Sequence, residues 1–169
     1  IYKNKNNSDY LRNLLSINKK YKILLYQGVL NKNRGISNIL HIVRSLNFCV
    51  AVIVGDGCER KHLVGLAESL NIKSKIFFLD RVPYKDLFKI TQSADIGCVL
   101  IKPVGLNNRF ALPNKLFEYV AAGIPCVGAN IPNIKYFIEK YDLGKTVDPF
   151  NIEKQILAFK SVFSHTYNK

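Results

Sequence analysis

Short apolar runs alternate with longer amphipathic segments along most of this chain, and this alternation limits the folds that it can adopt. From Lys22 onward, runs of strand length are followed by segments in which apolar residues recur at helical spacing. Strands that alternate with helices in this way form βαβ units with a parallel sheet. We expect strands at residues 22–26, 48–54, 76–79, 96–100, 126–128 and 144–147.

The same pattern places helices on both faces of the expected sheet. The first four strands are almost continuously apolar, which is typical of strands that helices cover on both sides. We expect these helices at residues 35–46, 59–70, 84–91, 114–122, 133–141 and 151–163. The predicted fold class is therefore α/β, with a Rossmann-like, doubly wound, mainly parallel sheet of six strands. Such sheets bind ligands beyond the carboxyl ends of their strands.

The chain divides into a short lead-in and one domain. Residues 1–20 are rich in Asn, Lys and Ser, and we interpret them as a loosely held lead-in with a short helical piece around 10–15. Residues 21–169 contain all the expected strands and fit a single domain. The chain begins with Ile1 rather than Met, and we take it to be a fragment of a longer protein.

Composition narrows the classes of partner. The 169 residues include 25 Lys and Arg against 12 Asp and Glu, which gives a formal net charge of +13. Such a surplus suits nucleic acid, an anionic membrane surface or phosphate-bearing small molecules. The longest apolar run, 48–54, is too short to cross a membrane. The four cysteines lack the spacing of a zinc site, and Cys49, Cys98 and Cys126 lie in apolar runs typical of buried free thiols.

The loop after the first expected strand carries residues suited to phosphate. Gly28 lets the backbone approach a ligand, and Lys32 and Arg34 stand just before a helix N-terminus, where amides favour anions. The loop is either phosphate-facing or an ordinary glycine turn with two solvated cations.

The next two loops give weaker signals. Gly55-Asp56-Gly57 lacks the third glycine of a dinucleotide fingerprint, so we interpret it as a tight turn. The stretch 80–83 either reads a base edge through its peptide groups or is an extended connection fixed by Pro83.

The segment 103–125 is the most informative, because a polar loop there leads into a short helix that contains Glu118. Its neighbours are apolar on nearly every side, so we expect this helix to be largely buried. A carboxylate in such surroundings needs a partner. That partner is either Lys115, one turn earlier, or the hydroxyl groups of a sugar. Lys115 and the free amides expected around Ala111 and Leu112 also lie at the helix N-terminus, which favours anions.

Several ordered segments together form a recognisable pattern. They are Tyr26-Gln27-Gly28-Val29-Leu30 with Arg34-Gly35, Val54-Gly55-Asp56-Gly57 with Arg60, Phe77-Phe78-Leu79 with Val82-Pro83, Ser93-Ala94-Asp95-Ile96, and PNKLFEY followed by AAGIP. With the glycine-to-proline stretch 144–149, they resemble the C-terminal, donor-binding half of B-type-fold (GT-B) glycosyltransferases of the retaining family 4, glycosyl transferases group 1. The resemblance covers residues 22–149.

The resemblance implies a set of donor-binding residues. They are Gly28, Arg34, Val82, Ala111, Leu112, Lys115 and Glu118. Gly28 would let the first loop approach the donor, and Arg34, where the family usually has Lys, would contact its diphosphate. Backbone amides near Ala111 and Leu112 would meet the phosphate or the sugar. The resemblance assigns no catalytic residue in this half.

The resemblance implies two further roles, and the sequence departs from the family pattern at three positions. The resemblance gives Glu118 the ribose hydroxyls and places Val82 near the base. Val29 stands where the family often has a phosphate-binding Arg, and Phe110 stands where the first of two glutamates falls. Asp80 replaces a glycine that usually precedes the base-contacting residues.

The implied function is transfer of a sugar from a UDP- or GDP-sugar to an acceptor, in bacterial cell-surface polysaccharide synthesis such as capsule, O-antigen or exopolysaccharide. The acceptor would be presented by an N-terminal domain, so we expect this chain to bind the donor but to transfer little alone. The sequence has no Asp-x-Asp, and fixed cations can stabilise a departing diphosphate, so we expect no metal and no other cofactor. We expect a cytoplasmic location, and peripheral contact with an anionic inner membrane is a hypothesis for the surplus lysines.

Two other classes stay open. A sugar-nucleotide epimerase of the same architecture needs acid–base groups, and His41, His62 and His165 lie outside the candidate loops. A nucleic-acid-binding domain would explain the charge, but zinc-finger spacing and RNA-type aromatic motifs are missing, so we expect no nucleic-acid partner.

Overall fold

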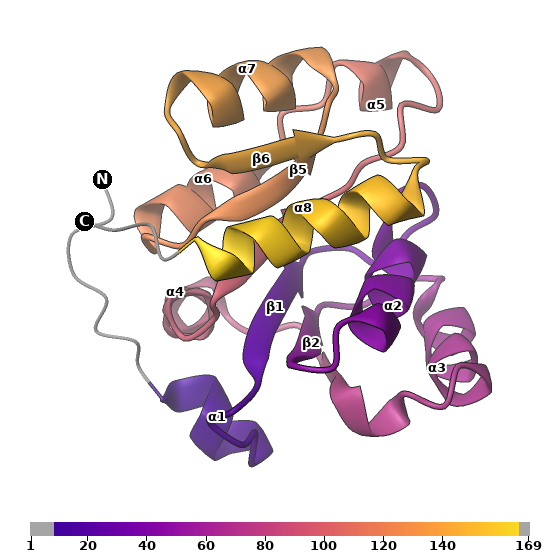
Figure 1. Cartoon of the computed structure of the whole chain (residues 1–169), viewed down its shortest axis with the longest axis vertical. Helices are drawn as coiled ribbons and strands as arrows, with labels where there is room; N and C mark the ends of the chain where they lie inside the picture. The colour runs from indigo at the N-terminus through magenta and orange to yellow at the C-terminus, as the bar shows by residue number, and fades with distance from the viewer. Residues whose placement is uncertain (1–8, 166–169) are drawn as a thin grey trace.

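The computed structural model describes residues 9–165, and its centre is a parallel sheet (Figure 1). The strands are β1 (Lys22–Gln27), β2 (Cys49–Val54), β3 (Ile76–Leu79), β4 (Ile96–Val99), β5 (Cys126–Ala129) and β6 (Gly144–Val147). They form a 6-stranded sheet in the order β3-β2-β1-β4-β5-β6, and every pairing is parallel. The predicted fold class is confirmed, and each predicted strand end lies within one residue of the observed end.

Helices cover both faces of the sheet. They are α1 (Tyr10–Leu15), α2 (Ile36–Ser45), α3 (Arg60–Ser69), α4 (Tyr84–Gln92), α5 (Leu106–Arg109), α6 (Asn114–Ala121), α7 (Pro132–Lys140) and α8 (Ile152–Ser164). One apolar core joins α2, α3 and α8 to the sheet, and a second core joins α1, α4, α6 and α7 to its other face. Within residues 9–165, no helix is long and apolar enough to span a membrane.

Strand β1 lies at the point where the strand order reverses. It pairs with β2 on one side and with β4 on the other. The loop after β1 leads to α2 on one face, whereas the loop after β4 leads towards α6 on the opposite face. Loops that part in this way leave a crevice at the carboxyl edge of the sheet, which is where doubly wound folds bind ligands.

The ends of β1 and β2 approach each other closely at two glycines. The amide of Gly28 donates to the carbonyl of Val54 at 2.9 Å. Gly55 has a φ of +133°, and a Cβ at this position would lie 2.1 Å from the carbonyl oxygen of Gly28. Because no side chain fits there, Gly55 keeps the two loops in contact.

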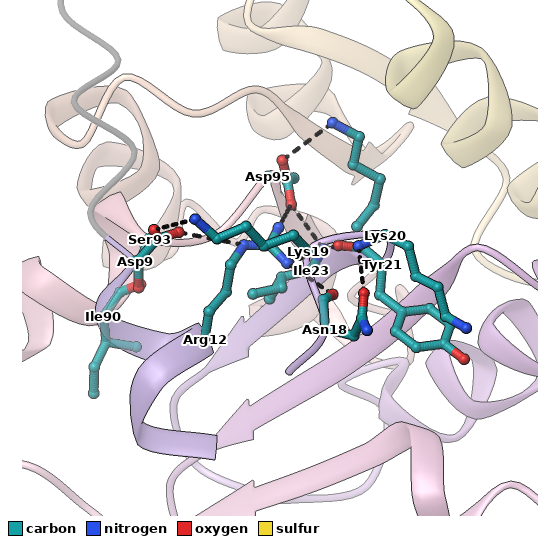
Figure 2. Close-up of polar contacts among 11 residues, drawn as sticks. Asp9, Arg12, Asn18, Lys19, Lys20, Tyr21, Ile23, Ile90, Ser93 and Asp95 are labelled. Atoms are coloured by element: carbon teal, nitrogen blue, oxygen red, sulfur yellow. Dashed lines mark hydrogen bonds and ion pairs between the residues drawn. The ribbon is translucent and has the colours of Figure 1, made fainter. Parts of the chain in front are cut away.

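Residues 9–20 of the predicted lead-in are packed against the domain rather than loosely held, and its residues 1–8 lie outside the described part of the chain. Residues 10–15 form α1, as predicted, and Leu11 is fully buried. The guanidinium of Arg12 pairs with Asp95 at 3.1 Å and also donates to the carbonyl of Tyr21 at 2.9 Å (Figure 2). Asp95 accepts a further bond from the amide of Ile23 at 2.8 Å. The ion pair between Arg12 and Asp95 anchors α1 to the sheet. It could not be predicted from the composition of residues 1–20, because the partner of Arg12 lies 83 positions away.

Other differences concern helices. The sequence pattern missed the short helix α5 and a 3₁₀ turn at Lys73–Lys75. Helix α6 was expected to be largely buried, but only Leu116 and Tyr119 are buried in it, and Phe117 is 44% exposed. Helix α8, which was predicted, packs on the core through the buried residues Phe159 and Val162.

Candidate functional site: a cleft at the carboxyl edge of the sheet

A hollow of about 380 Å³, called the cleft below, opens at the carboxyl ends of β1 and β2. Its lining comes from residues 27–29 at the end of β1, 54–55 at the end of β2, 81–82 after β3 and 113–115 at the start of α6. Leu87 and Glu118 complete it. These segments meet because the carboxyl ends of parallel strands share one edge of the sheet.

Four residues of the predicted donor site line this cleft together. Gly28 comes from the first loop, Val82 from the loop after β3, and Lys115 and Glu118 from α6. The structure therefore gathers backbone, apolar side chain, cation and carboxylate from three separate segments. Their roles towards a ligand stay predictions.

Glu118 is held by a side chain from the sheet. The amide nitrogen of Gln27 donates to Oε2 of Glu118, and Thr91 lies at 2.9 Å from the carbonyl oxygen of that amide. Among residues 9–165, no ion pair joins Lys115 to Glu118, so the local ion pair considered from the sequence is not formed. One carboxylate oxygen thus has a protein partner, and the group lines the cleft.

Lys115 lies over an aromatic ring. Its ammonium nitrogen is 3.6 Å from the centre of the Tyr26 ring, and the ring is fixed by a hydrogen bond from the Tyr26 hydroxyl to the carbonyl of Val29 at 2.9 Å. The pKa of Lys115 is lowered to about 7, mainly by desolvation in this packed position and also by the charge of Arg34, while Cys98 and Glu118 oppose the shift. A lysine with this pKa gains charge readily when an anion arrives.

Arg34 contributes to the cleft through its charge rather than its surface. It lines a separate hollow of about 40 Å³ beside α2, together with Lys32 and Lys102. It is nevertheless near enough to act on the pKa of Lys115. The structure therefore brings Arg34 close to the other predicted residues but not into the lining.

Ala111 and Leu112 lie just outside the cleft, because Pro113 is the first residue of this segment that lines it. We expected free amides here, but the amide of Ala111 donates to the carbonyl of Asn108 at 3.3 Å, because the turn that ends α5 uses it. The donor-binding role of these amides stays a prediction. Phe110, where the family has a glutamate, is 56% exposed and is also outside the lining.

Helix α6 is fixed to the sheet by the residue after Glu118. The ring of Tyr119 packs against Gly97 of β4, where a Cβ would lie 2.3 Å from the ring. The Tyr119 hydroxyl donates towards the carbonyls of Leu25 and Cys98, at 3.2 and 3.4 Å. Because Tyr119 is fully buried between β1 and β4, the position of its neighbour Glu118 is set by the sheet.

An arginine joins the two loops on the other side of the cleft. Arg60 pairs with Asp80 at 2.7 Å and donates to the carbonyl of Gly55 at 3.2 Å. Asp80 is the residue that replaces the family's glycine, so its side chain has a structural partner here. The pair places the loop that carries Arg81 and Val82 next to the end of β2.

The sequence missed several lining residues. Gln27 was not singled out, although a polar residue that ends an otherwise apolar strand is a signal for a site at the carboxyl edge. Arg81 lies two residues after the end of β3 and carries the same signal. Leu87 also lines the cleft from α4, and Thr91 of the same helix contacts Gln27 behind it; nothing in their pattern distinguishes them from core positions.

Among the described residues, metal-binding side chains and thiols do not form a second candidate site. Across residues 9–165, no three His, Cys, Asp or Glu side chains are grouped so that they could hold a metal ion. Cys49, Cys98 and Cys126 are buried free thiols, as predicted, and Cys58 is exposed.

Comparison with known proteins identifies the family. Residues 8–167 match the family described as Glycosyl transferases group 1. This chain belongs to that family. As a group 1 glycosyltransferase chain, it is similar to an uncharacterized glycosyltransferase of Haemophilus influenzae, with 30% identity over 105 residues that cover 62% of this chain and 28% of that protein.

Solved structures share the fold. WaaG, a glycosyltransferase involved in lipopolysaccharide biosynthesis, superposes with a TM-score of 0.77 at 20% identity, over 96% of this chain and 43% of WaaG. HepE of Anabaena, solved in complex with UDP, gives a TM-score of 0.81 at 16% identity, over 95% of this chain and 43% of HepE. This group 1 glycosyltransferase chain therefore spans less than half the length of each of these three relatives.

Proposed function

We propose that the cleft binds the nucleoside diphosphate part of a UDP- or GDP-sugar, and that the intact protein transfers the sugar to an acceptor. The observation that carries this proposal is the meeting of Lys115 and Glu118 beside the backbone of Gly28 in one cleft. A cation suits the diphosphate, and a carboxylate that only accepts hydrogen bonds suits the two ribose hydroxyls. The structure of HepE with UDP supports a nucleotide ligand for this fold.

The residues of the cleft would act on the donor in defined ways. In the reaction, the bond between the sugar and the diphosphate breaks, a bond between the sugar and an acceptor oxygen forms, and the acceptor loses a proton. Lys115 and the nearby charge of Arg34 would stabilise the negative charge that develops on the departing diphosphate. Val82 would pack against the base, and no metal or other cofactor is required in this proposal.

The acceptor side belongs to the rest of the protein. This chain covers 43% of WaaG, so we propose that a further, N-terminal domain completes the enzyme and presents the acceptor. The chain alone would bind donor without efficient transfer. The link of WaaG to lipopolysaccharide supports a role in bacterial cell-surface polysaccharide synthesis.

We also propose that the intact protein works on the cytoplasmic side of the cell membrane, in peripheral contact with anionic lipid. The net charge of +13 supports this, because only a few of the cations surround the cleft. Sedimentation of the full-length protein with vesicles should increase with the fraction of anionic lipid. Equal sedimentation with neutral and anionic vesicles would remove the membrane from the proposal.

Thermal unfolding with nucleotides tests the donor site. UDP or GDP at about 100 times its Kd should stabilise the chain by about 2.7 kcal/mol. Comparison of the shifts in Tm with UDP, GDP and ADP would identify the preferred base. Glu118→Ala should abolish most of the shift in Tm. Glu139→Ala is the matched control, because Glu139 is also a helical glutamate that accepts a hydrogen bond from a side chain, that of Thr146. No shift with any nucleoside diphosphate would overturn the proposal.

A further inference from the structure

Three side chains from three elements form a chain of hydrogen bonds behind the cleft. Thr91 of α4 lies with its hydroxyl 2.9 Å from the carbonyl oxygen of Gln27, at the end of β1. The amide nitrogen of Gln27 donates to Oε2 of Glu118 on α6. Gln27 is 2% exposed and Thr91 is 1% exposed, so water does not compete for these groups.

The chemistry of the three groups fixes the direction of this chain. A carboxylate only accepts hydrogen bonds, so the amide nitrogen of Gln27 must face Glu118. The carbonyl oxygen of Gln27 then faces Thr91, whose hydroxyl can donate to it. The carbonyl of Leu87, at 2.8 Å, is a second acceptor for the same hydroxyl. A buried amide with an unsatisfied end would be costly, so Thr91 keeps Gln27 in the orientation that serves Glu118.

Two hollows lie beside Glu118, so the hydrogen bond from Gln27 matters for how its carboxylate is placed. One is the cleft, and the other is a hollow of about 220 Å³ between α4 and α6, lined by Tyr84, Phe88 and Ala121 among others. Glu118 borders both. The bond from Gln27 occupies Oε2 and leaves Oε1 for a ligand.

We propose that Gln27 and Thr91 are positioning residues, which hold Glu118 so that its free oxygen meets the ribose hydroxyls of the donor. This inference rests on the proposed function and adds two residues to the site. Thr91 does not line the cleft, and Gln27 lines it with both ends of its amide engaged by Glu118 and Thr91. Their effect on the ribose therefore passes through the carboxylate.

The test compares two ligands that differ only at the ribose. The Kd values of UDP and 2′,3′-dideoxy-UDP are measured for the chain and for Thr91→Val, which keeps the shape and removes the hydroxyl. The wild-type chain should prefer UDP by roughly tenfold or more, since hydrogen bonds to a charged group are strong. Thr91→Val should lose most of this preference, and Thr91→Ser, which restores the hydroxyl, should recover it.

Two further variants separate positioning from general destabilisation. Thr146→Val removes a hydroxyl that also contacts a glutamate, 3.1 Å away on α7, and should leave the ratio of the two Kd values unchanged. Gln27→Met removes both polar ends of the amide and should lower the ratio as Thr91→Val does. It provides the measurement if Thr91→Val does not fold.

The outcomes distinguish this inference from the proposed function. A wild-type chain that binds UDP and its dideoxy analogue equally would contradict the role of Glu118 itself. A wild-type preference that persists in Thr91→Val and in Gln27→Met would leave the donor site standing and overturn the positioning role.

Discussion

The ammonium nitrogen of Lys115 lies 3.6 Å from the centre of the Tyr26 ring, and it would contact any Cβ placed on Gly28. This contact places a cation directly before Val29, the position at which the family often carries a phosphate-binding arginine. A helix residue from the second half of the chain thus stands where the first loop lacks a charge.

Binding of a diphosphate should therefore take up protons. The pKa of Lys115 is lowered to about 7 in the free chain, so at pH 7 about half of the molecules carry the charge. A bound diphosphate favours the charged form and raises this pKa, so up to about half a proton is taken up per UDP. Affinity should fall as the pH rises above 7.

Calorimetry in buffers of different ionisation enthalpy measures this uptake. Lys115→Arg is the control, because arginine is charged throughout this pH range, and the protons of UDP itself are the same for both proteins. Equal uptake by the wild-type chain and by Lys115→Arg would show that Lys115 does not titrate on binding.

Loss of the anchor at the amino edge of the sheet should destabilise the chain without changing nucleotide affinity. Arg12→Met leaves the nearly buried carboxylate of Asp95 without its closest cation, which should lower the free energy of unfolding by about 2 kcal/mol. Urea denaturation and UDP titration give the two readouts. Lys19→Met breaks the exposed pair with Asp9 and should change stability by less than about 1 kcal/mol. Equal effects of the two variants would contradict an anchor at Arg12.

A methyl group at Gly55 should separate the ends of β1 and β2. The Cβ of Gly55→Ala would lie 2.1 Å from the carbonyl oxygen of Gly28, so the loops must move apart, with a loss of about 2 kcal/mol or more in stability and weaker UDP binding. Gly105→Ala is the matched control, since Gly105 also has a positive φ, +83°, but has open space around it. Similar losses of UDP affinity in both variants would attribute the effect to backbone strain alone.

Removal of Arg60 should alter the preference among bases. Arg60→Met frees both Asp80 and the carbonyl of Gly55, so the loop with Val82 loses its side-chain link to the end of β2. The ratio of the Kd values for UDP and GDP should change by roughly threefold or more, as for the loss of one hydrogen bond. Lys73→Met, which breaks a surface pair with Glu68, should leave the ratio unchanged. An unaltered ratio in Arg60→Met would separate this pair from base recognition.

The sequence predicted the fold well because its signals are local. Strands such as Cys49–Val54 are continuously apolar and covered on both faces, so their length and position follow from the run of apolar residues in the sequence. Exposure of α6 was misjudged because an apolar residue need not be covered: Phe117 meets Phe137 edge to face, with ring centres 5.4 Å apart, and remains partly open to water.

The candidate site was predicted only in part, because its decisive contacts join distant segments. The cation and the carboxylate were found from their places at a helix N-terminus and in an apolar helix. The partner of Glu118 was missed, because Gln27 lies 91 positions away and meets it only through the packing of α6 on the sheet. The same reason hid the anchor of Arg12.

The attachment of α6 through Tyr119 has a consequence for changing donor specificity. The ring fills the space above Gly97, between two central strands, so the carboxylate next to it does not depend on the surrounding loops for its position. In the proposed donor site, loops 80–83 and 103–112 should therefore be exchangeable with those of other group 1 glycosyltransferases while Glu118 stays in place. On this proposal, recognition of base and sugar is open to engineering one loop at a time against a fixed carboxylate.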